Sequence, residues 1–125
     1  GKGRIMFVDD EPQIVELNRK LLSKLGYEVT GRTDPKEAWA LFQENPNGFD
    51  AIITDQTMPG MTGIDLGARI SALRPGIPIL ICSGFSNQVS PEKVRALGFA
   101  GYLSKPVGFA TLAEVVKTAL AKTTQ

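Results

Sequence analysis

Three carboxylates stand where two predicted strands end. Asp9 and Asp10 follow the apolar run Arg4–Val8, and Asp55 ends a run that begins at Ala51. In an open parallel sheet, ligands bind just beyond the carboxyl ends of the strands. Carboxylates that share such a pocket repel one another and are costly to desolvate, so the group requires a cation.

The oxygen chemistry of this group favours Mg²⁺ or Mn²⁺ as the cation. Zinc prefers thiolate and imidazole ligands, whereas the chain has one cysteine and no histidine. The absence of histidine also excludes an imidazole-based catalytic triad and a phosphohistidine on this chain.

Alternating apolar runs and amphipathic segments must position these carboxylates. Strands are predicted at residues 4–8, 27–31, 51–55, 77–82 and 102–104, and helices at 12–25, 35–44, 63–73, 91–97 and around Leu112 to Leu120. This alternation indicates a doubly wound α/β fold with five parallel strands, five helices and right-handed crossovers. The flavodoxin-like strand order 2-1-3-4-5 would place the first strand beside the third, so that Asp9, Asp10 and Asp55 share one pocket.

Helical spacing predicts which apolar side chains face the sheet. The first helix is expected to present Ile14, Leu17, Leu21 and Leu25, and the helix at 63–73 to bury Leu66, Ile70 and Leu73. Asp34 is expected to cap the helix at 35–44, and Trp39 and Cys82 to lie in the core.

Length and composition indicate one compact domain. The chain has 125 residues, 42% of them hydrophobic, and a net charge of +1. We therefore expect a single domain over residues 1–125 with its core at about 4–121. The weak charge does not favour nucleic acid as a direct partner, and no apolar run reaches membrane-spanning length. The single cysteine excludes an intramolecular disulfide and predicts a cytoplasmic location, although a longer parent protein could be anchored in a membrane.

Four short motifs, each at a predicted strand end, resemble the receiver domain of two-component response regulators, a CheY-like family. They are Asp9-Asp10, Asp55 with Met58-Pro59-Gly60 and Gly63, Ser83-Gly84, and Lys105-Pro106. Each has an ordinary structural explanation when taken alone: an acidic helix N-cap, a turn aspartate, a loop-capping serine and a solvated lysine. For all four explanations to hold, four motifs would have to occur by chance in the family's order, over almost the whole chain.

The resemblance implies that Asp55 is a phosphoacceptor. Asp55 would take a phosphoryl group from a phosphohistidine on a partner histidine kinase or phosphotransfer domain, forming an acyl phosphate. Lys105 and the Ser83 hydroxyl would bind the phosphoryl oxygens. The peptide bond between Lys105 and Pro106 is implied to be cis.

The resemblance also implies a ligand set for Mg²⁺ or Mn²⁺. Asp10 and Asp55 would bind the ion directly, and the backbone carbonyl of Thr57 would supply a third protein ligand. Asp9 would act mainly through a metal-bound water. The cation would make phosphoryl transfer a matter of positioning and charge neutralisation.

A conformational switch is implied at Ser83 and Tyr102. Ser83 would move toward the phosphoryl group and draw in residues 84–90, and Tyr102 would swing into the vacated space. This would remodel the surface formed by the helix at 91–97, the last strand and the last helix, with dimerisation as one output. An ordinary half-buried strand aromatic is the alternative interpretation of Tyr102.

Two positions depart from receivers that lose their phosphoryl group quickly. Such receivers often carry an acidic or amide side chain two residues after the phosphoacceptor or two residues after the Ser83 position, where this chain has Thr57 and Phe85. Neither side chain orients an attacking water well, so we expect slow self-dephosphorylation.

The phrases Thr54-Asp-Gln-Thr-Met-Pro-Gly-Met-Thr-Gly63 and Cys82-Ser-Gly-Phe85 are similar to receivers at the carboxyl end of hybrid sensor histidine kinases. A stand-alone regulator and a receiver separated from its output domain are alternative origins. Among other functions, a phosphorylation-independent interaction module (pseudo-receiver) stays open, although all the acceptor residues are present. An Mg²⁺-dependent phosphatase of the haloacid-dehalogenase type would require a second aspartate at Thr57, and a flavodoxin would require a phosphate loop after the first strand.

Overall fold

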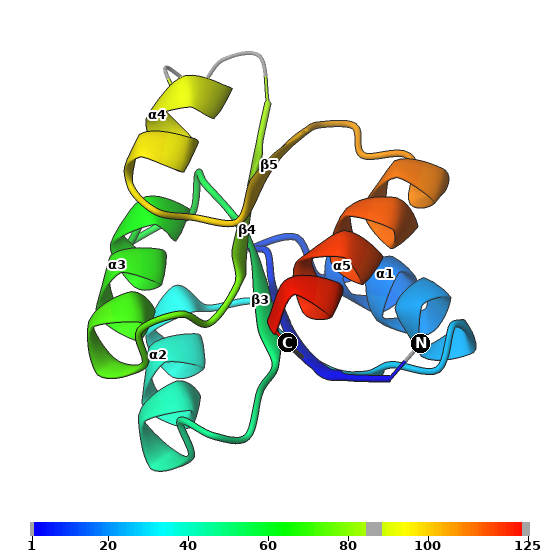
Figure 1. Cartoon of the computed structure of the whole chain (residues 1–125), viewed down its shortest axis with the longest axis horizontal. Helices are drawn as coiled ribbons and strands as arrows, with labels where there is room; N and C mark the ends of the chain where they lie inside the picture. The colour runs from blue at the N-terminus through cyan, green and yellow to red at the C-terminus, as the bar shows by residue number, and fades with distance from the viewer. Residues whose placement is uncertain (1, 85–88, 124–125) are drawn as a thin grey trace.

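A parallel sheet with helices on both faces forms the molecule (Figure 1). The structure is a computed structural model, and it describes residues 2–84 and 89–123. In chain order the elements are β1 (Arg4–Val8), α1 (Pro12–Lys24), β2 (Glu28–Arg32), α2 (Pro35–Glu44), β3 (Ala51–Asp55), α3 (Gly63–Leu73), β4 (Ile79–Ser83), α4 (Pro91–Ala96), β5 (Gly101–Ser104) and α5 (Phe109–Thr123). The strands are parallel and lie in the order β2-β1-β3-β4-β5, which confirms the predicted fold class and strand order.

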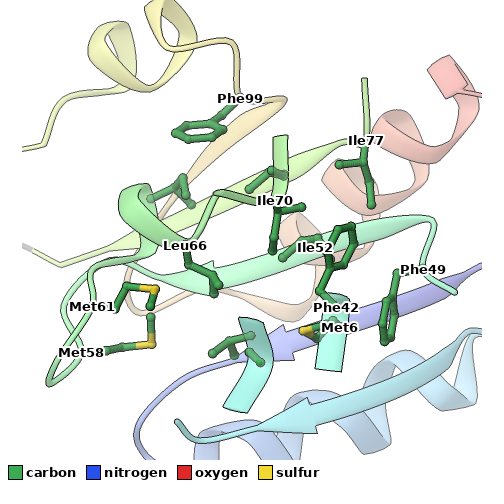
Figure 2. Packing of buried hydrophobic residues seen from close by; sticks show 14 of the residues in the cluster. Met6, Phe42, Phe49, Ile52, Met58, Met61, Leu66, Ile70, Ile77 and Phe99 are labelled. Atoms are coloured by element: carbon green, nitrogen blue, oxygen red, sulfur yellow. The ribbon is translucent and has the colours of Figure 1, made fainter. Parts of the chain in front are cut away.

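The helices divide between the two faces of the sheet. Figure 1 shows α1 and α5 on one face and α2, α3 and α4 on the other. Successive residues of a strand point to opposite faces, so Ile52 packs in the cluster beneath α2 and α3, whereas Ile53 packs in the cluster beneath α1 and α5. Figure 2 shows the first cluster, in which Phe42 of α2 and Ile70 of α3 meet Ile52. Burial on both faces explains why the central strands are continuous apolar runs.

Local signals set most helix starts. Asp34 caps α2 by accepting a hydrogen bond from the Lys36 N–H (2.9 Å), as predicted. Thr62 caps α3 in the same way through the Asp65 N–H (3.1 Å). Because each cap satisfies a backbone donor that lacks a partner within its helix, α2 and α3 begin at fixed positions relative to the strands that precede them.

Three leucines predicted to be buried are exposed. Leu17 of α1 is 54% exposed, Leu25, which follows α1, is 36% exposed, and Leu73 of α3 is 47% exposed. Val15 and Leu22 make the buried stripe of α1 instead. Leu17 lies two positions from Val15, which is roughly 200° around the helix, so both cannot face the sheet.

The boundaries of three strands also differ from the prediction, and β5 begins at Gly101, one residue earlier than the predicted 102–104. β2 begins and ends one residue later than residues 27–31, and β4 covers Ile79–Ser83 rather than 77–82. Pro78 has no N–H to donate to a ladder, although its carbonyl accepts from Ile52 N–H (3.0 Å), so β4 starts after it. Because β4 ends later than predicted, Ser83 is its last residue, at the carboxyl end of the strand. No helix among the described residues is both long enough and apolar enough to cross a bilayer.

Candidate functional site

The sheet brings the ends of β1, β3 and β4 together at one edge. Val8 pairs with Thr54, so Asp9 and Asp55 each stand one residue beyond a paired position on adjacent strands. Asp55 in turn pairs with Cys82, which puts Ser83 next to Asp55 on the other side. This arrangement follows from the order of the strands, because β3 lies between β1 and β4.

Asp9, Asp10 and Asp55 form a carboxylate cluster. One carboxylate oxygen from each lies within 4.8 Å of the others. Asp9 and Asp55 are 2% and 6% exposed, and Asp10 is exposed to solvent. Asp9 Oδ1 accepts from the backbone N–H of Glu11 (3.0 Å), and Glu11 occupies the N-cap of α1 without a side-chain bond. The acidic residue at the N-cap therefore makes no side-chain capping hydrogen bond to α1.

Lys105 supplies the cation that the structure places in this cluster. Its Nζ lies 2.9 Å from Asp9 Oδ2 and 3.1 Å from Asp55 Oδ1. The backbone N–H of Lys105 donates to the Ser83 carbonyl (2.9 Å), which ties the end of β5 to the end of β4. The peptide bond between Lys105 and Pro106 is cis.

The electrostatics of the cluster leave it short of positive charge. Burial raises the pKa of Asp55, the charge of Asp9 raises it further, and Lys105 only partly opposes this. Burial lowers the pKa of Lys105, but its hydrogen bonds and charge interactions with Asp9 and Asp55 outweigh burial and leave that pKa raised. Three carboxylates against one ammonium leave two negative charges, which a divalent cation would neutralise.

Ser83 has a buried hydroxyl without a hydrogen-bond partner among the described residues. Its side chain is fully buried at the end of β4. A buried hydroxyl without a hydrogen-bond partner costs folding free energy. Ser83 therefore fits a group that accepts a hydrogen bond in the liganded site.

The loop between β3 and α3 borders the cluster and carries Thr57, which is exposed. Gly63 begins α3 directly against β3: a Cβ at this position would lie 2.3 Å from the Asp55 carbonyl oxygen. The glycine of the motif is thus required by close packing rather than by an unusual backbone angle. Gln56, between Asp55 and Thr57, is buried and hydrogen-bonded to α3, a contact that its position in the sequence did not predict.

Tyr102 lies apart from the carboxylate cluster. Tyr102 pairs with Ile81 in the sheet, is partly buried and packs against the hydrophobic core that contains Val94 and Phe99. Phe85, to which we attributed slow loss of a phosphoryl group, lies outside the described residues.

An apolar groove leads away from the site. It has a volume of about 620 Å³ and lies beside α1 and the start of α5, with Asp9, Asp55 and Lys105 among its lining residues. Leu17 and Phe109, both exposed, line it as well. The exposed position of Leu17 is thus part of a surface that adjoins the carboxylates.

Comparison with known proteins identifies the family. Residues 5–117 match the model of the response regulator receiver domain. The chain is 36% identical over 123 residues to the transcriptional regulatory protein ZraR of Salmonella typhimurium, covering 98% of this chain and 27% of that protein. It therefore spans about a quarter of the length of that curated relative.

Solved structures agree with this match. A response regulator receiver domain protein from Clostridium thermocellum superposes with a TM-score of 0.92 at 29% identity, covering 97% of this chain and 96% of that one. The chemotaxis protein CheY4 of Vibrio cholerae has a TM-score of 0.82 at 31% identity, covering 95% of this chain and 99% of that one. The chain belongs to the family of response regulator receiver domains of two-component systems.

Proposed function

We propose that Asp55 accepts a phosphoryl group and that the chain is a phosphorylation-controlled receiver module over residues 1–125. The observation that carries the proposal is the convergence of three carboxylates, one lysine and one serine hydroxyl on the end of β3, the hydroxyl having no partner among the described residues. Asp55 is the central member because β3 lies between β1, which Asp9 follows, and β4, which ends at Ser83. Lys105 Nζ contacts both Asp9 and Asp55. This arrangement suits transfer chemistry, which requires a nucleophile held among charge-neutralising groups.

The residues present fit Mg²⁺ or Mn²⁺. Carboxylate and carbonyl oxygens are the ligands these ions prefer, and the residual double negative charge of the cluster matches a divalent ion. Asp10 and Asp55 would bind it directly with the Thr57 backbone carbonyl, and Asp9 would act through a bound water. The ion would supply neutralisation of charge on Asp55 and on the incoming phosphoryl oxygens.

The transfer itself is a substitution at phosphorus. A carboxylate oxygen of Asp55 forms a bond to the phosphorus of a phosphohistidine on a histidine kinase or phosphotransfer domain. The phosphorus–nitrogen bond breaks, and the imidazole nitrogen keeps the electron pair. Lys105, already within 3.1 Å of Asp55, neutralises a phosphoryl oxygen, and the Ser83 hydroxyl donates a hydrogen bond to another.

The same contacts account for signal output. The Ser83 hydroxyl, which has no partner among the described residues, would gain a hydrogen bond to a phosphoryl oxygen, and this bond would favour a rearranged end of β4. Tyr102 on β5 would respond, and the surface of α4, β5 and α5 would change its partners, including a second copy of the chain. The switch residues are Ser83 and Tyr102, and the module itself does not need to bind nucleic acid or act on a small-molecule substrate.

Incubation with acetyl phosphate and Mg²⁺, followed by intact mass measurement, tests the proposal. We expect the mass of one added phosphoryl group, lost on treatment with hydroxylamine and absent when the metal is chelated. Asp55→Asn should remove it. A pseudo-receiver would show no added mass, and a phosphatase would instead release inorganic phosphate with repeated turnover and no retained phosphoryl group.

The phosphorylated chain should also be long-lived. Thr57 offers neither an acid nor an amide to orient the attacking water, so we expect the added mass to persist for many minutes in isolated protein. Thr57→Glu should accelerate the loss, with Thr57→Ser as the matched control. A half-life of seconds in the unmodified chain would contradict this part of the proposal.

A further inference from the structure

Gln56, which follows β3, makes one hydrogen bond to β4 and two to the start of α3. Its backbone N–H donates to the Cys82 carbonyl (2.8 Å), and its own carbonyl accepts from the Gly63 N–H (3.0 Å). Its side-chain Oε1 accepts from the Ile64 N–H (2.8 Å). With a side chain that is nearly buried, at 9% exposure for the residue, Gln56 is fixed to β4 and to α3 at once.

The first backbone donors of α3 depend on Gln56. The early N–H groups of a helix have no partner within the helix. Gln56 takes the first two of these, from Gly63 and Ile64, and the Thr62 side chain takes the third, from Asp65. An ordinary N-cap would need one side chain, so the additional amide requires an explanation.

The geometry of the loop provides one. Residues 57–62 leave Gln56 and return to it, because the next residue, Gly63, is hydrogen-bonded to the Gln56 carbonyl. The return is close: a Cβ on Gly63 would lie 2.3 Å from the Asp55 carbonyl oxygen and 3.1 Å from the Gln56 Cα. Both ends of the loop are therefore held against the residue that follows the phosphoacceptor. Thr57, whose carbonyl belongs to the proposed ligand set, is the first residue of this closed loop.

We propose that Gln56 is a positioning residue for the divalent cation: its bond to the Ile64 N–H holds the loop so that the Thr57 carbonyl completes the ligand set. The inference rests on the proposed function, since it assumes that the carboxylate cluster takes Mg²⁺ or Mn²⁺. Groups that orient metal ligands contribute to affinity without touching the ion. A simple helix cap would stabilise α3 and leave affinity for the ion unchanged.

Three variants separate these two roles. Gln56→Met keeps the length of the side chain and removes the acceptor oxygen. Thr62→Ala removes a bond to the neighbouring donor of the same helix start and leaves Gln56 in place. Gln56→Glu restores an acceptor oxygen at the position of the amide oxygen. Far-UV circular dichroism checks that each variant is folded, and exchange of the Ile64 amide hydrogen without metal should quicken in Gln56→Met alone.

Binding of Mn²⁺, followed by loss of the free-ion electron paramagnetic resonance signal, is the deciding measurement. We expect Gln56→Met to bind Mn²⁺ about tenfold more weakly than the unmodified chain. Thr62→Ala should remain within about twofold at a similar loss of thermal stability, and Gln56→Glu should bind no more weakly than the unmodified chain, because its added negative charge also favours a cation.

The outcomes against the inference are distinct from those against the function. Equal weakening in Gln56→Met and Thr62→Ala, unchanged affinity in Gln56→Met, or weakening in Gln56→Glu would each overturn the positioning role. These results would leave the phosphoacceptor proposal intact if the unmodified chain binds Mn²⁺ and Asp55→Asn does not. Absence of Mn²⁺ binding by the unmodified chain would instead contradict the metal site of the proposed function, and the positioning role with it.

Discussion

Two aspartates at the two ends of β3, Asp50 and Asp55, have pKa values shifted in opposite directions. Asp50 immediately precedes the strand, and its carboxylate accepts bonds from the Arg4 backbone N–H (2.8 Å) and from its guanidinium (3.2 and 3.3 Å). The side-chain bond to Arg4 lowers the pKa of Asp50. Asp55 ends the strand, and burial together with the charge of Asp9 raises its pKa despite Lys105.

This difference is what we expect between a carboxylate with a structural role and one that binds a ligand. The charges of Arg4 and Asp50 neutralise each other, and their bonds join β1 to the segment before β3. No further cation is needed to balance the charge there. The carboxylates around Asp55 outnumber their lysine, and a buried hydroxyl beside them has no partner among the described residues. An excess of buried negative charge of this kind is typical of a site that binds a ligand.

The largest expected difference between the two aspartates is in phosphorylation. Asp55→Asn should abolish labelling by acetyl phosphate and Mg²⁺, because the amide cannot form the acyl phosphate. Asp50→Asn should label within about twofold of the unmodified chain, since it lies at the opposite end of β3. Intact mass at matched times checks both. Strong loss of labelling in folded Asp50→Asn would show that the two ends are not independent.

Removal of the positively charged side chain that pairs with each aspartate should lower the stability of the protein by unequal amounts. Lys105→Met leaves Asp9 and Asp55 buried without their partner, so we expect a loss of about 3 kcal/mol in the free energy of unfolding of the metal-free protein. Arg4→Met, which breaks an exposed pair, should lose clearly less. Denaturant titration in the presence of a chelator measures both.

Addition of Mn²⁺ should affect the two variants differently. The ion should restore part of the free energy of unfolding lost in Lys105→Met, because it places a positive charge among the carboxylates again. It should restore none of the free energy lost through the Arg4→Met substitution. Equal losses in the two variants, or no response of Lys105→Met to Mn²⁺, would contradict the charge imbalance inferred for the carboxylates.

The two aspartates should also differ in how pH changes their contribution to stability. A raised pKa means that ionised Asp55 opposes folding, so metal-free Asp55→Asn should be more stable than the unmodified chain near pH 7. That advantage should shrink as the pH falls through the raised pKa, which lies above 3.8, the ordinary value. The lowered pKa of Asp50 means that its ionised form stabilises the fold, so Asp50→Asn should be less stable near pH 7.

The deficit of Asp50→Asn should persist to lower pH than the advantage of Asp55→Asn. It should disappear only as the pH falls below 3.8 and through the lowered pKa. Denaturant titrations of the three metal-free proteins across this range measure both differences. The same sign of effect at neutral pH for the two variants would show that the carboxylates are not held in opposite ways.

The smallest expected effects concern two buried hydroxyls. Thr54 Oγ1 donates to the Asp55 carbonyl (3.0 Å), so Thr54→Val should lose about 1 kcal/mol of stability. Ser83→Ala removes a hydroxyl that has no partner in the described residues, and should leave the unphosphorylated protein unchanged or more stable by about 1 kcal/mol. Thermal denaturation compares them, and a substantial loss in Ser83→Ala would mean that this hydroxyl already has a structural role.

Much of this molecule could be predicted from residue order. The alternation of apolar strands with helices led to the sheet, and carboxylates at the ends of two strands led to the cluster, because strand ends of a parallel sheet lie at one edge. Spacing alone could not show how each helix is rotated on the sheet, so Leu17 and Leu73 were wrongly predicted to be buried.

The contacts of Gln56 were also beyond sequence reasoning. A glutamine in a loop rich in turn residues has the appearance of a solvated side chain, and its partner is eight residues away. Only the position of α3 against β3 shows that this amide is buried and bonded. The resemblance placed Lys105, which directly follows β5, at this site, but the residue order did not predict its bonds to Asp9 and Asp55 in the absence of a phosphoryl group.

We propose that Asp55, among the six aspartates of the chain (9, 10, 34, 50, 55 and 65), carries the phosphoryl group. Reduction of the acetyl phosphate-treated chain with borohydride converts an acyl phosphate of aspartate to homoserine, which tandem mass spectrometry of peptides can locate. The account predicts homoserine at position 55 and aspartate at positions 9, 10, 34, 50 and 65. Homoserine at any of these other positions, or at none in a chain that carries the added mass, would contradict it.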